Sequence, residues 1–350
     1  MKKTTAVLVS ALVAALAALA VRHCPDAVPA AGEGGKAAPT VFVSIPPLRG
    51  LVSDLLPAGA AEVREVVPAG ASPEQFEPSP ADVRALSGAR LLFAVGENFE
   101  SAWLGRVQAQ MPGLRVVQLG DGLATLRFGE EGKEHHHHHD GEHADHDEHE
   151  VAEQGHEHHE HADHDGEHGE HADAHHHHHH SGADPHIWTD PHNLVELARR
   201  AASELKEIFP GRSAEIDSNL ARAEAKYAEL DRKLAELFAP HAGRAILVFH
   251  PAWGYLCHRY GLKQVAVEEA GHAPSPRTLA RTIEFAREEK IAAIFVAAQT
   301  DRRVAASISQ ELGVPTVVLD PLAPDLAAAL EESSLAIAGA LGTKGAKGAE

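Results

Sequence analysis

Short apolar runs alternate with amphipathic stretches over most of the chain from residue 40 to residue 341. Runs of this length are typical of buried strands, and the stretches between them have the 3.6-residue period of helices. Such alternation predicts parallel βαβ units. In the first half the predicted strands are Thr40–Ile45, Glu62–Val67, Arg90–Val95 and Leu114–Leu119, and the predicted helices are Leu48–Leu56, Ser79–Ser87 and Glu97–Met111.

The same pattern returns in the last hundred residues. The predicted strands there are Ala245–Phe249, Gln264–Val267, Ile291–Val296 and Thr316–Leu319. The predicted helices are Trp253–Tyr260, Pro276–Lys290, Arg303–Leu312 and Leu326–Leu341. The sequence therefore predicts a second α/β lobe built like the first.

Two helices are predicted between these halves, over Asn193–Ile208 and Ser213–Phe238. The second is amphipathic and has no glycine or proline, and at about 1.5 Å per residue it would reach roughly 39 Å. We therefore expect an α/β fold of two lobes with parallel sheets, joined by one long backbone helix. The expected boundaries are 40–211 for the N-terminal lobe, 212–240 for the linking helix and 241–342 for the C-terminal lobe.

Residues 129–183 interrupt the N-terminal lobe with a segment that has no hydrophobic periodicity. Such a segment buries too little apolar surface to offset the entropy of ordering it, so we expect a disordered insertion. Its central part, 134–180, holds 21 of the 28 histidines and 15 acidic residues, with no Lys or Arg. The uninterrupted histidines are His135, His136, His137, His138, His139, His175, His176, His177, His178, His179 and His180.

The negative charge of the chain is concentrated in this insertion. The formal net charge is −20, and the 15 acidic residues of 134–180 leave −5 for the remainder. A basic face for nucleic acid is therefore not expected.

The first residues have the layout of a secretory signal peptide. Lys2 and Lys3 precede an apolar run over Thr5–Val21, and small residues follow. We expect residues 1–31 to comprise this signal and the start of a linker, which places the mature protein in the periplasm without stable membrane insertion. An uncleaved membrane anchor is the alternative. Lipidation at Cys24 is a weaker one, because the residues before it form a poor lipobox.

The chemistry of the insertion indicates metal binding. Neutral imidazole suits zinc, nickel and copper, and the adjacent carboxylates raise the local cation concentration. A flexible tract makes a poor selective site, because it must lose conformational entropy for every ligand that it recruits. Three other interpretations remain open: an expression tag, an acidic spacer, and metal binding without functional consequence.

A stiffer site is predicted from histidines outside the insertion. His250 follows the strand Ala245–Phe249 and precedes Pro251, and Asp320 follows the strand Thr316–Leu319 in the same way. Ligands of open α/β sheets bind beyond the carboxyl ends of strands. His186 lies between two Asp-Pro units, so Asp184 or Asp190 is expected to orient its ring. A role as a simple cap, turn or solvated residue is the alternative for each. We interpret His192 and His272 as surface or tract-adjacent residues.

Four ordered motifs carry a resemblance to a known family. They are Gly70–Pro78, Asp184–Trp188, Phe249–Tyr255 and Leu319–Leu322. Together with the histidine-rich insertion before the second motif, they resemble the periplasmic zinc- and manganese-binding proteins of ABC importers, whose fold is shared with adhesin-type lipoproteins. The ZnuA-type zinc branch is the nearest match, and the resemblance covers about residues 40–341.

The resemblance implies one metal ion in the cleft between the lobes, held by one ligand from each motif. His186, His250 and Asp320 match the ligand types of the family, whereas Glu74 stands where the family usually has histidine. Either Glu74 binds the metal, or water or a histidine of the insertion takes its place. Two histidines and two carboxylates also suit manganese or iron, but the insertion favours zinc, and nickel is a further alternative.

The expected function is zinc capture and delivery to the permease of an ABC importer by a monomer that is not an enzyme. The histidine-rich insertion would act as a low-affinity antenna or as a sensor of high zinc. A periplasmic zinc buffer without an importer is one alternative. A zinc hydrolase is another, although the sequence has no HExxH helix.

Overall fold

The computed structural model describes residues 39–96, 98–128, 183–268, 273–300 and 302–342. The predicted signal segment, residue His272 and the stretch 129–182, which contains all the clustered histidines, lie outside the described residues. Residues from Thr40 onward belong to one structural unit. Within the described part of that unit, no helix is long and apolar enough to cross a membrane.

The first lobe contains a sheet of four parallel strands in the order β2-β1-β3-β4. Its strands are β1 (Thr40–Val43), β2 (Glu62–Glu65), β3 (Ala89–Ala94) and β4 (Arg115–Gln118). Its helices are α2 (Pro46–Leu55), α3 (Pro80–Leu86) and α4 (Asn98–Gln110), with a short 3₁₀ turn η1 (Pro73–Gln75). Leu91, Leu92 and Phe93 of β3 are all buried. Helices cover both faces of the sheet, so an interior strand is apolar at successive positions.

The second lobe repeats this arrangement with the strand order β6-β5-β7-β8. Its strands are β5 (Ala245–Val248), β6 (Lys263–Ala266), β7 (Ile294–Ala297) and β8 (Thr316–Leu319). Its helices are α7 (Gly254–Arg259), α8 (Pro276–Glu288), α9 (Arg302–Leu312) and α10 (Leu326–Gly342). All pairs of neighbouring strands are parallel. Their carboxyl ends therefore lie along one edge of the sheet, where a ligand site is expected.

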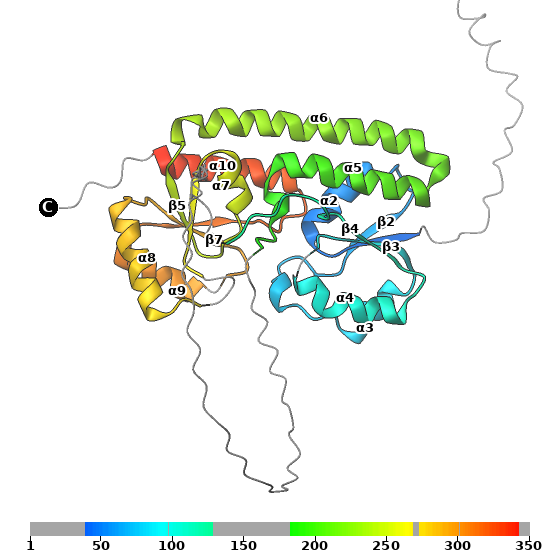
Figure 1. The fold of residues 1–350 in the computed structure, drawn as a ribbon, viewed down its shortest axis with the longest axis horizontal. Helices are drawn as coiled ribbons and strands as arrows, with labels where there is room; N and C mark the ends of the chain where they lie inside the picture. Colours follow the sequence, from blue (N-terminus) through cyan, green and yellow to red (C-terminus); the bar gives the residue numbers. More distant parts are fainter. Residues whose placement is uncertain (1–38, 97, 129–182, 269–272, 301, 343–350) are drawn as a thin grey trace, which may run out of the picture. The chain divides into compact units, whose positions relative to one another are not determined.

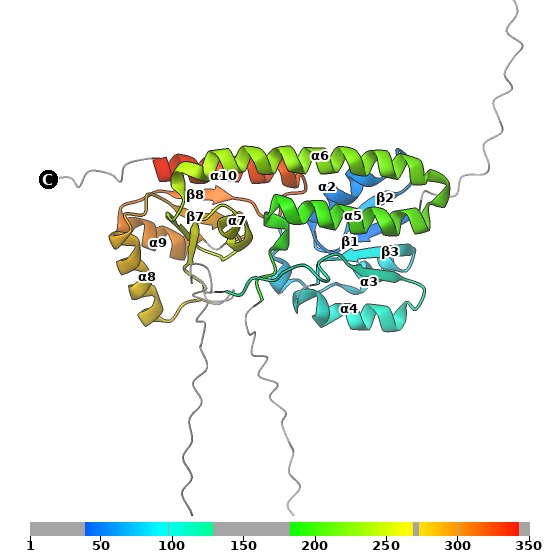
Figure 2. The same ribbon diagram turned by 45° about the horizontal axis from the view of Figure 1, so that its top comes forward.

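Between the two sheets the chain forms η2 (Ile187–Thr189), α5 (Pro191–Ile208), η3 (Pro210–Arg212), α6 (Ser213–Phe238) and η4 (Ala239–His241). In Figures 1 and 2 the long helix α6 runs past both lobes, beside α5, α2 and α10. Its buried side chains, among them Tyr227, Leu230 and Leu234, form one stripe at helical spacing. This stripe belongs to a hydrophobic core that continues from one lobe into the other.

Polar contacts also tie α6 to both lobes. Near its start, the side-chain amide of Asn219 donates to the carbonyl oxygen of Leu55 at 3.0 Å in the first lobe. Near its end, Lys233 pairs with Glu331 of α10 at 3.2 Å in the second lobe. The helix therefore restrains both lobes along one side of the molecule.

The first lobe and η2 also approach the loop that follows β8. A Cβ atom added at Gly50 of α2 would lie 2.1 Å from the carbonyl oxygen of Pro324, so only glycine permits this close approach. The indole Nε1 of Trp188 donates to the carbonyl oxygen of Pro321 at 2.8 Å. These contacts place the loop after β8 directly beside the segment that carries His186.

The predicted α/β fold of two parallel-sheet lobes with a long helix is confirmed. Most predicted boundaries differ from the structure by at most two residues. The largest difference is at β7, which was predicted from Ile291 but starts at Ile294. Lys290 adopts a left-handed conformation with φ 53°, and the amide of Ile291 donates back to Ala286 of α8 at 3.0 Å. Ile291 therefore completes the helix end, which apolar periodicity alone does not reveal.

Candidate metal centre

His186 is held by a buried carboxylate two residues before it. Asp184 Oδ1 accepts from the His186 backbone amide at 2.9 Å and lies 2.8 Å from the ring Nδ1. Asp184 is 1% exposed and His186 is 6% exposed, so water does not compete with these bonds. The carboxylate is the acceptor, so the ring carries its proton on Nδ1 and has a lone pair on Nε2.

His250 has the same kind of partner in the second lobe. It follows β5, and its Nδ1 lies 2.9 Å from Oε2 of Glu268, which follows β6. Because β5 and β6 are parallel neighbours, their carboxyl ends bring these two side chains together. The Glu268 carboxylate therefore favours the tautomer of His250 that carries its proton on Nδ1. The lone pair is then on Nε2, the nitrogen that does not contact Glu268.

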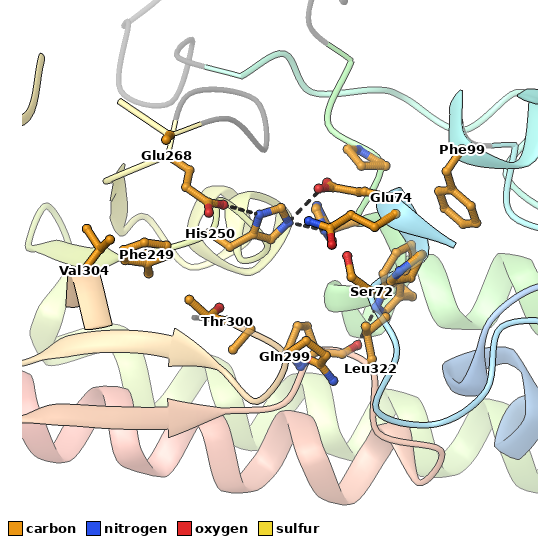
Figure 3. A pocket seen from close by; sticks show the side chains of 18 of the residues that line it. Ser72, Glu74, Phe99, Phe249, His250, Glu268, Gln299, Thr300, Val304 and Leu322 are labelled. Atoms are coloured by element: carbon orange, nitrogen blue, oxygen red, sulfur yellow. Dashed lines mark hydrogen bonds and ion pairs between the residues drawn. The ribbon is translucent and has the colours of Figure 1, made fainter. Parts of the chain in front are cut away.

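The two Nε2 atoms face one another at 3.4 Å, and Figure 3 shows His250 at the middle of the site. Two neutral rings with both Nδ1 protons committed to carboxylates present two acceptors, which cannot hydrogen bond to each other. A cation bound to both nitrogens satisfies both. Zinc–nitrogen bonds of about 2.0–2.1 Å at a tetrahedral angle place the nitrogens about 3.3–3.4 Å apart, which matches the distance between these two atoms.

Glu74 reaches the same point from the first lobe. It lies in η1, which begins at buried Pro73, and its Oε1 is 3.5 Å from Nε2 of His250. Its side chain is 40% exposed, whereas that of His250 is 17% exposed. The structure therefore places three of the four predicted site residues around one cavity: Glu74, His186 and His250.

Asp320 is the predicted site residue that the structure does not join to the others. Its Oδ1 accepts from the Leu322 amide at 3.0 Å and from Nε2 of Gln299 at 3.3 Å. Gln299 lines the cavity in front of it, and Asp320 is not among the lining residues. Within the described residues, no group of three or more His, Cys, Asp or Glu side chains is placed so that it could hold a metal ion. The role of Asp320 as a ligand therefore stays a prediction.

The facing imidazoles open into a cavity of about 300 Å³. Its apolar walls come from both lobes and include Phe99, Trp188, Phe249, Val304 and Leu322. Figure 3 shows Phe99 on one side of His250 and Val304 and Phe249 on the other. Apolar walls lower the local dielectric constant, which strengthens the attraction between a bound cation and the carboxylates.

The charges around His250 change its affinity for a proton. Burial alone would lower the pKa of the imidazole. The hydrogen bond that Glu268 accepts from the ring and the negative charges of Glu74, Glu268 and Asp184 outweigh burial, so that the pKa of His250 lies above its ordinary value. The same three carboxylates favour any other cation at this position.

Sequence reasoning identified Asp184 correctly as one of two candidates for orienting His186. The other candidate, Asp190, instead caps α5 by accepting from the His192 amide at 2.8 Å, and it pairs with Arg259 at 3.2 Å. Burial raises the pKa of Asp190, against the opposing effects of that bond and of Arg259.

Glu268 and Gln299 were missed by sequence reasoning. Each follows a strand of the second sheet by two residues, and the same rule that selected His250 and Asp320 would have found them. The expectation that His192 lies at the surface agrees with the structure, in which it is exposed. His258 is also exposed, and Cys257 is a buried free cysteine of the core. The insertion histidines and His272 lie outside the described residues.

Comparisons with known proteins find zinc-binding proteins that are similar to this chain. Zinc-binding lipoprotein AdcA of Streptococcus pneumoniae is 32% identical over 141 residues, which is 40% of this chain and 28% of the relative's length. Zinc-binding protein AdcA of Streptococcus pyogenes is 25% identical over 141 residues, or 40% of this chain and 27% of that protein. The matched region thus spans less than a third of these relatives.

Solved structures match over a much larger share of the chain. The crystal structure of ZnuA has a TM-score of 0.69 and 26% identity, and covers 87% of this chain and 99% of its own. A ZnuA deletion mutant with zinc bound has a TM-score of 0.70 and 26% identity, covering 88% and 100%. The family profile described as zinc-uptake complex component A, periplasmic, matches residues 41–333. The chain therefore belongs to the ZnuA family of periplasmic solute-binding components of zinc uptake.

Proposed function

We propose that this protein captures Zn²⁺ in the periplasm as cargo and delivers it to the permease of an ABC importer. His186, His250 and Glu74 are the proposed ligands, and Asp320 is the candidate for a fourth. The observation that carries the proposal is the pair of Nε2 atoms 3.4 Å apart, each on a ring whose Nδ1 is tied to a carboxylate. Both neighbouring carboxylates increase the basicity of the nitrogen that faces the ion.

Zinc is favoured over harder cations because nitrogen supplies two of the three proposed ligands. Manganese is the second candidate, and one observation favours it: the ligand from the first lobe is the carboxylate of Glu74, a donor that suits manganese as well as zinc. The balance between the two metals therefore depends on a single position.

Release is proposed to begin at Glu74. His186 is held against the second lobe by the bonds of its segment, including that of Trp188 to Pro321. Glu74 belongs to the first lobe, and its side chain is the more exposed one of its pair with His250. A permease that changed the angle between the lobes would withdraw Glu74 first and weaken the hold on the ion.

The histidine-rich insertion is proposed to act as a low-affinity antenna or sensor near this site. Its two ends lie together, because Arg127 and Ala183 form an antiparallel bridge. Asp184, which orients His186, is the next residue after that bridge. Ions collected by the insertion would therefore be released close to the cleft.

Substitution of His250 by alanine should lower the affinity of the tight zinc site by at least about 100-fold, because one of two nitrogen ligands is lost. His258→Ala on α7 is the matched control, since His258 is exposed and should leave the affinity unchanged. Isothermal titration calorimetry with a competing chelator measures both. Equal affinities for His250→Ala and wild type would contradict the proposed ligand set.

Deletion of residues 134–180 should leave one tight zinc site and remove the weak ones. The bridge between Arg127 and Ala183 keeps the two ends in place, so the shortened loop can close. A control that retains the length of the insertion but replaces its histidines by glutamine should behave in the same way. If either variant lost the tight site as well, the division between insertion and cleft would be wrong.

Acidification should weaken zinc binding, because only neutral imidazole binds the ion. The pKa of His250 is raised, so its protonated form persists to a higher pH. As the pH is lowered, the affinity should therefore begin to fall while the pH is still above the ordinary imidazole pKa of about 6.5. Below that onset we expect a loss of about tenfold per pH unit for each proton displaced. Titrations from pH 8 to pH 5 measure the onset.

The control for this pH dependence is Glu268→Gln, which removes the hydrogen-bonded charge that raises the pKa of His250. The onset should then move to lower pH, whatever happens to the absolute affinity. An unchanged affinity between pH 7.5 and pH 5.5 in the wild type, or an onset that Glu268→Gln does not move, would count against this account.

Glu74→His should increase the preference for zinc over manganese by at least roughly tenfold, because a nitrogen donor replaces a hard oxygen donor. Gln75→His is the matched control, since Gln75 lines the same cavity one residue away. Competition between the two metals, followed by elemental analysis of the bound ion, measures the preference. An equal shift in both variants would show that Glu74 has no special position.

A further inference from the structure

The hydroxyl of Tyr255 lies where the two ends of the insertion meet. It donates to the carbonyl oxygen of Asp184 at 2.9 Å and accepts from the amide of Leu126 at 3.1 Å. The Asp184 amide in turn donates to the carbonyl oxygen of Leu126 at 2.7 Å. Tyr255 is 4% exposed, so these bonds are shielded from water. Both backbone polar groups of Asp184 are thereby fixed.

The fixed backbone determines where the Asp184 carboxylate points. Its Oδ1 bonds both the backbone amide and the ring Nδ1 of His186, and the residue is 1% exposed. The position of the His186 ring therefore depends on Asp184, and the position of Asp184 depends in part on the hydroxyl of Tyr255.

Tyr255 also belongs to the segment that carries the other imidazole. His250 lies five residues before it, between β5 and α7. One short stretch of the second lobe therefore supplies one imidazole and restrains the carboxylate that orients the other. The residues of this stretch therefore influence the positions of both imidazoles, whose Nε2 atoms lie 3.4 Å apart.

We propose that Tyr255 is a positioning residue of the metal centre, whose hydroxyl acts through Asp184 to hold His186 at the distance from His250 that a single ion requires. The inference rests on the proposed function. Without the hydroxyl, Asp184 and His186 remain in the chain but sample more orientations, and the ion must restore their order when it binds. The affinity therefore falls, while the number of ions bound at the tight site stays at one.

Tyr255→Phe tests this inference, because it removes the hydroxyl and keeps the buried ring. Tyr260→Phe is the matched control: its hydroxyl donates to Asp231 at 2.9 Å, on the same segment but outside the cleft. In the full-length chain, chelator competition gives the zinc affinity of the tight site. The visible absorption spectrum with one equivalent of Co²⁺ reports its coordination geometry, and thermal unfolding reports the stability.

Tyr255→Phe should lower the zinc affinity about tenfold and change the intensity or position of the Co²⁺ bands. Tyr260→Phe should lower the unfolding temperature and leave both metal readouts as in the wild type. A Tyr255→Phe protein with wild-type affinity and spectrum would overturn the inference. So would an equal loss of affinity in Tyr260→Phe, because that would show a general effect of reduced stability.

A double-mutant cycle with Asp184→Ala shows whether Tyr255 acts through Asp184. In the Asp184→Ala background, Tyr255→Phe should cause no further loss of affinity, and full additivity of the two losses would overturn the proposed route. Failure of the proposed function is a different result, because the wild type would then bind zinc no more tightly than His250→Ala does.

Discussion

The two facing imidazole nitrogens are the constraint on which the rest of the site depends. Each ring carries its remaining proton toward a carboxylate, Asp184 for His186 and Glu268 for His250, at 2.8 and 2.9 Å. Two lone pairs at 3.4 Å repel one another unless a cation lies between them. The two rings are held in this position because backbone hydrogen bonds fix the residues that carry both carboxylates, Asp184 and Glu268. The metal affinity therefore depends on how rigidly the two carboxylates and the backbone around them hold the imidazoles.

The fold provides that rigidity on one side of the molecule and leaves the other side open. Helix α6 and the hydrophobic core shared by both lobes join the two sheets, and Gly50 allows α2 to approach the loop after β8 closely. The carboxyl ends of β5 to β8 are each followed within two residues by a polar side chain: His250, Glu268, Gln299 and Asp320. The same strand order in both lobes makes this edge the natural place for a ligand.

The fold could be predicted from the sequence because buried parallel strands are continuous apolar runs and their connecting helices are amphipathic. His250 could be found because a strand ends there before a proline. Glu268 could not be assigned a role in the same way, because its contact with His250 depends on β6 pairing with β5 rather than with another strand. The bond from Gln299 to Asp320 likewise depends on β7 pairing with β8. Strand order and side-chain partners arise from tertiary packing, which periodicity along one chain does not encode.

The distribution of these contacts divides the site into a fixed part and an adjustable part. His186 comes from the chain before α5, yet Tyr255 restrains its partner Asp184 from the second lobe, and Trp188 bonds to the loop after β8. The same segment also packs against the first lobe, because Arg200 of α5 donates to the carbonyl oxygen of Leu119 at 2.8 Å. A bare pair of nitrogens binds an ion less tightly than the pair plus a carboxylate. Under the proposed function, Glu74 therefore adjusts the affinity through one exposed oxygen donor, while the buried pair of imidazoles carries the preference for a nitrogen-binding metal.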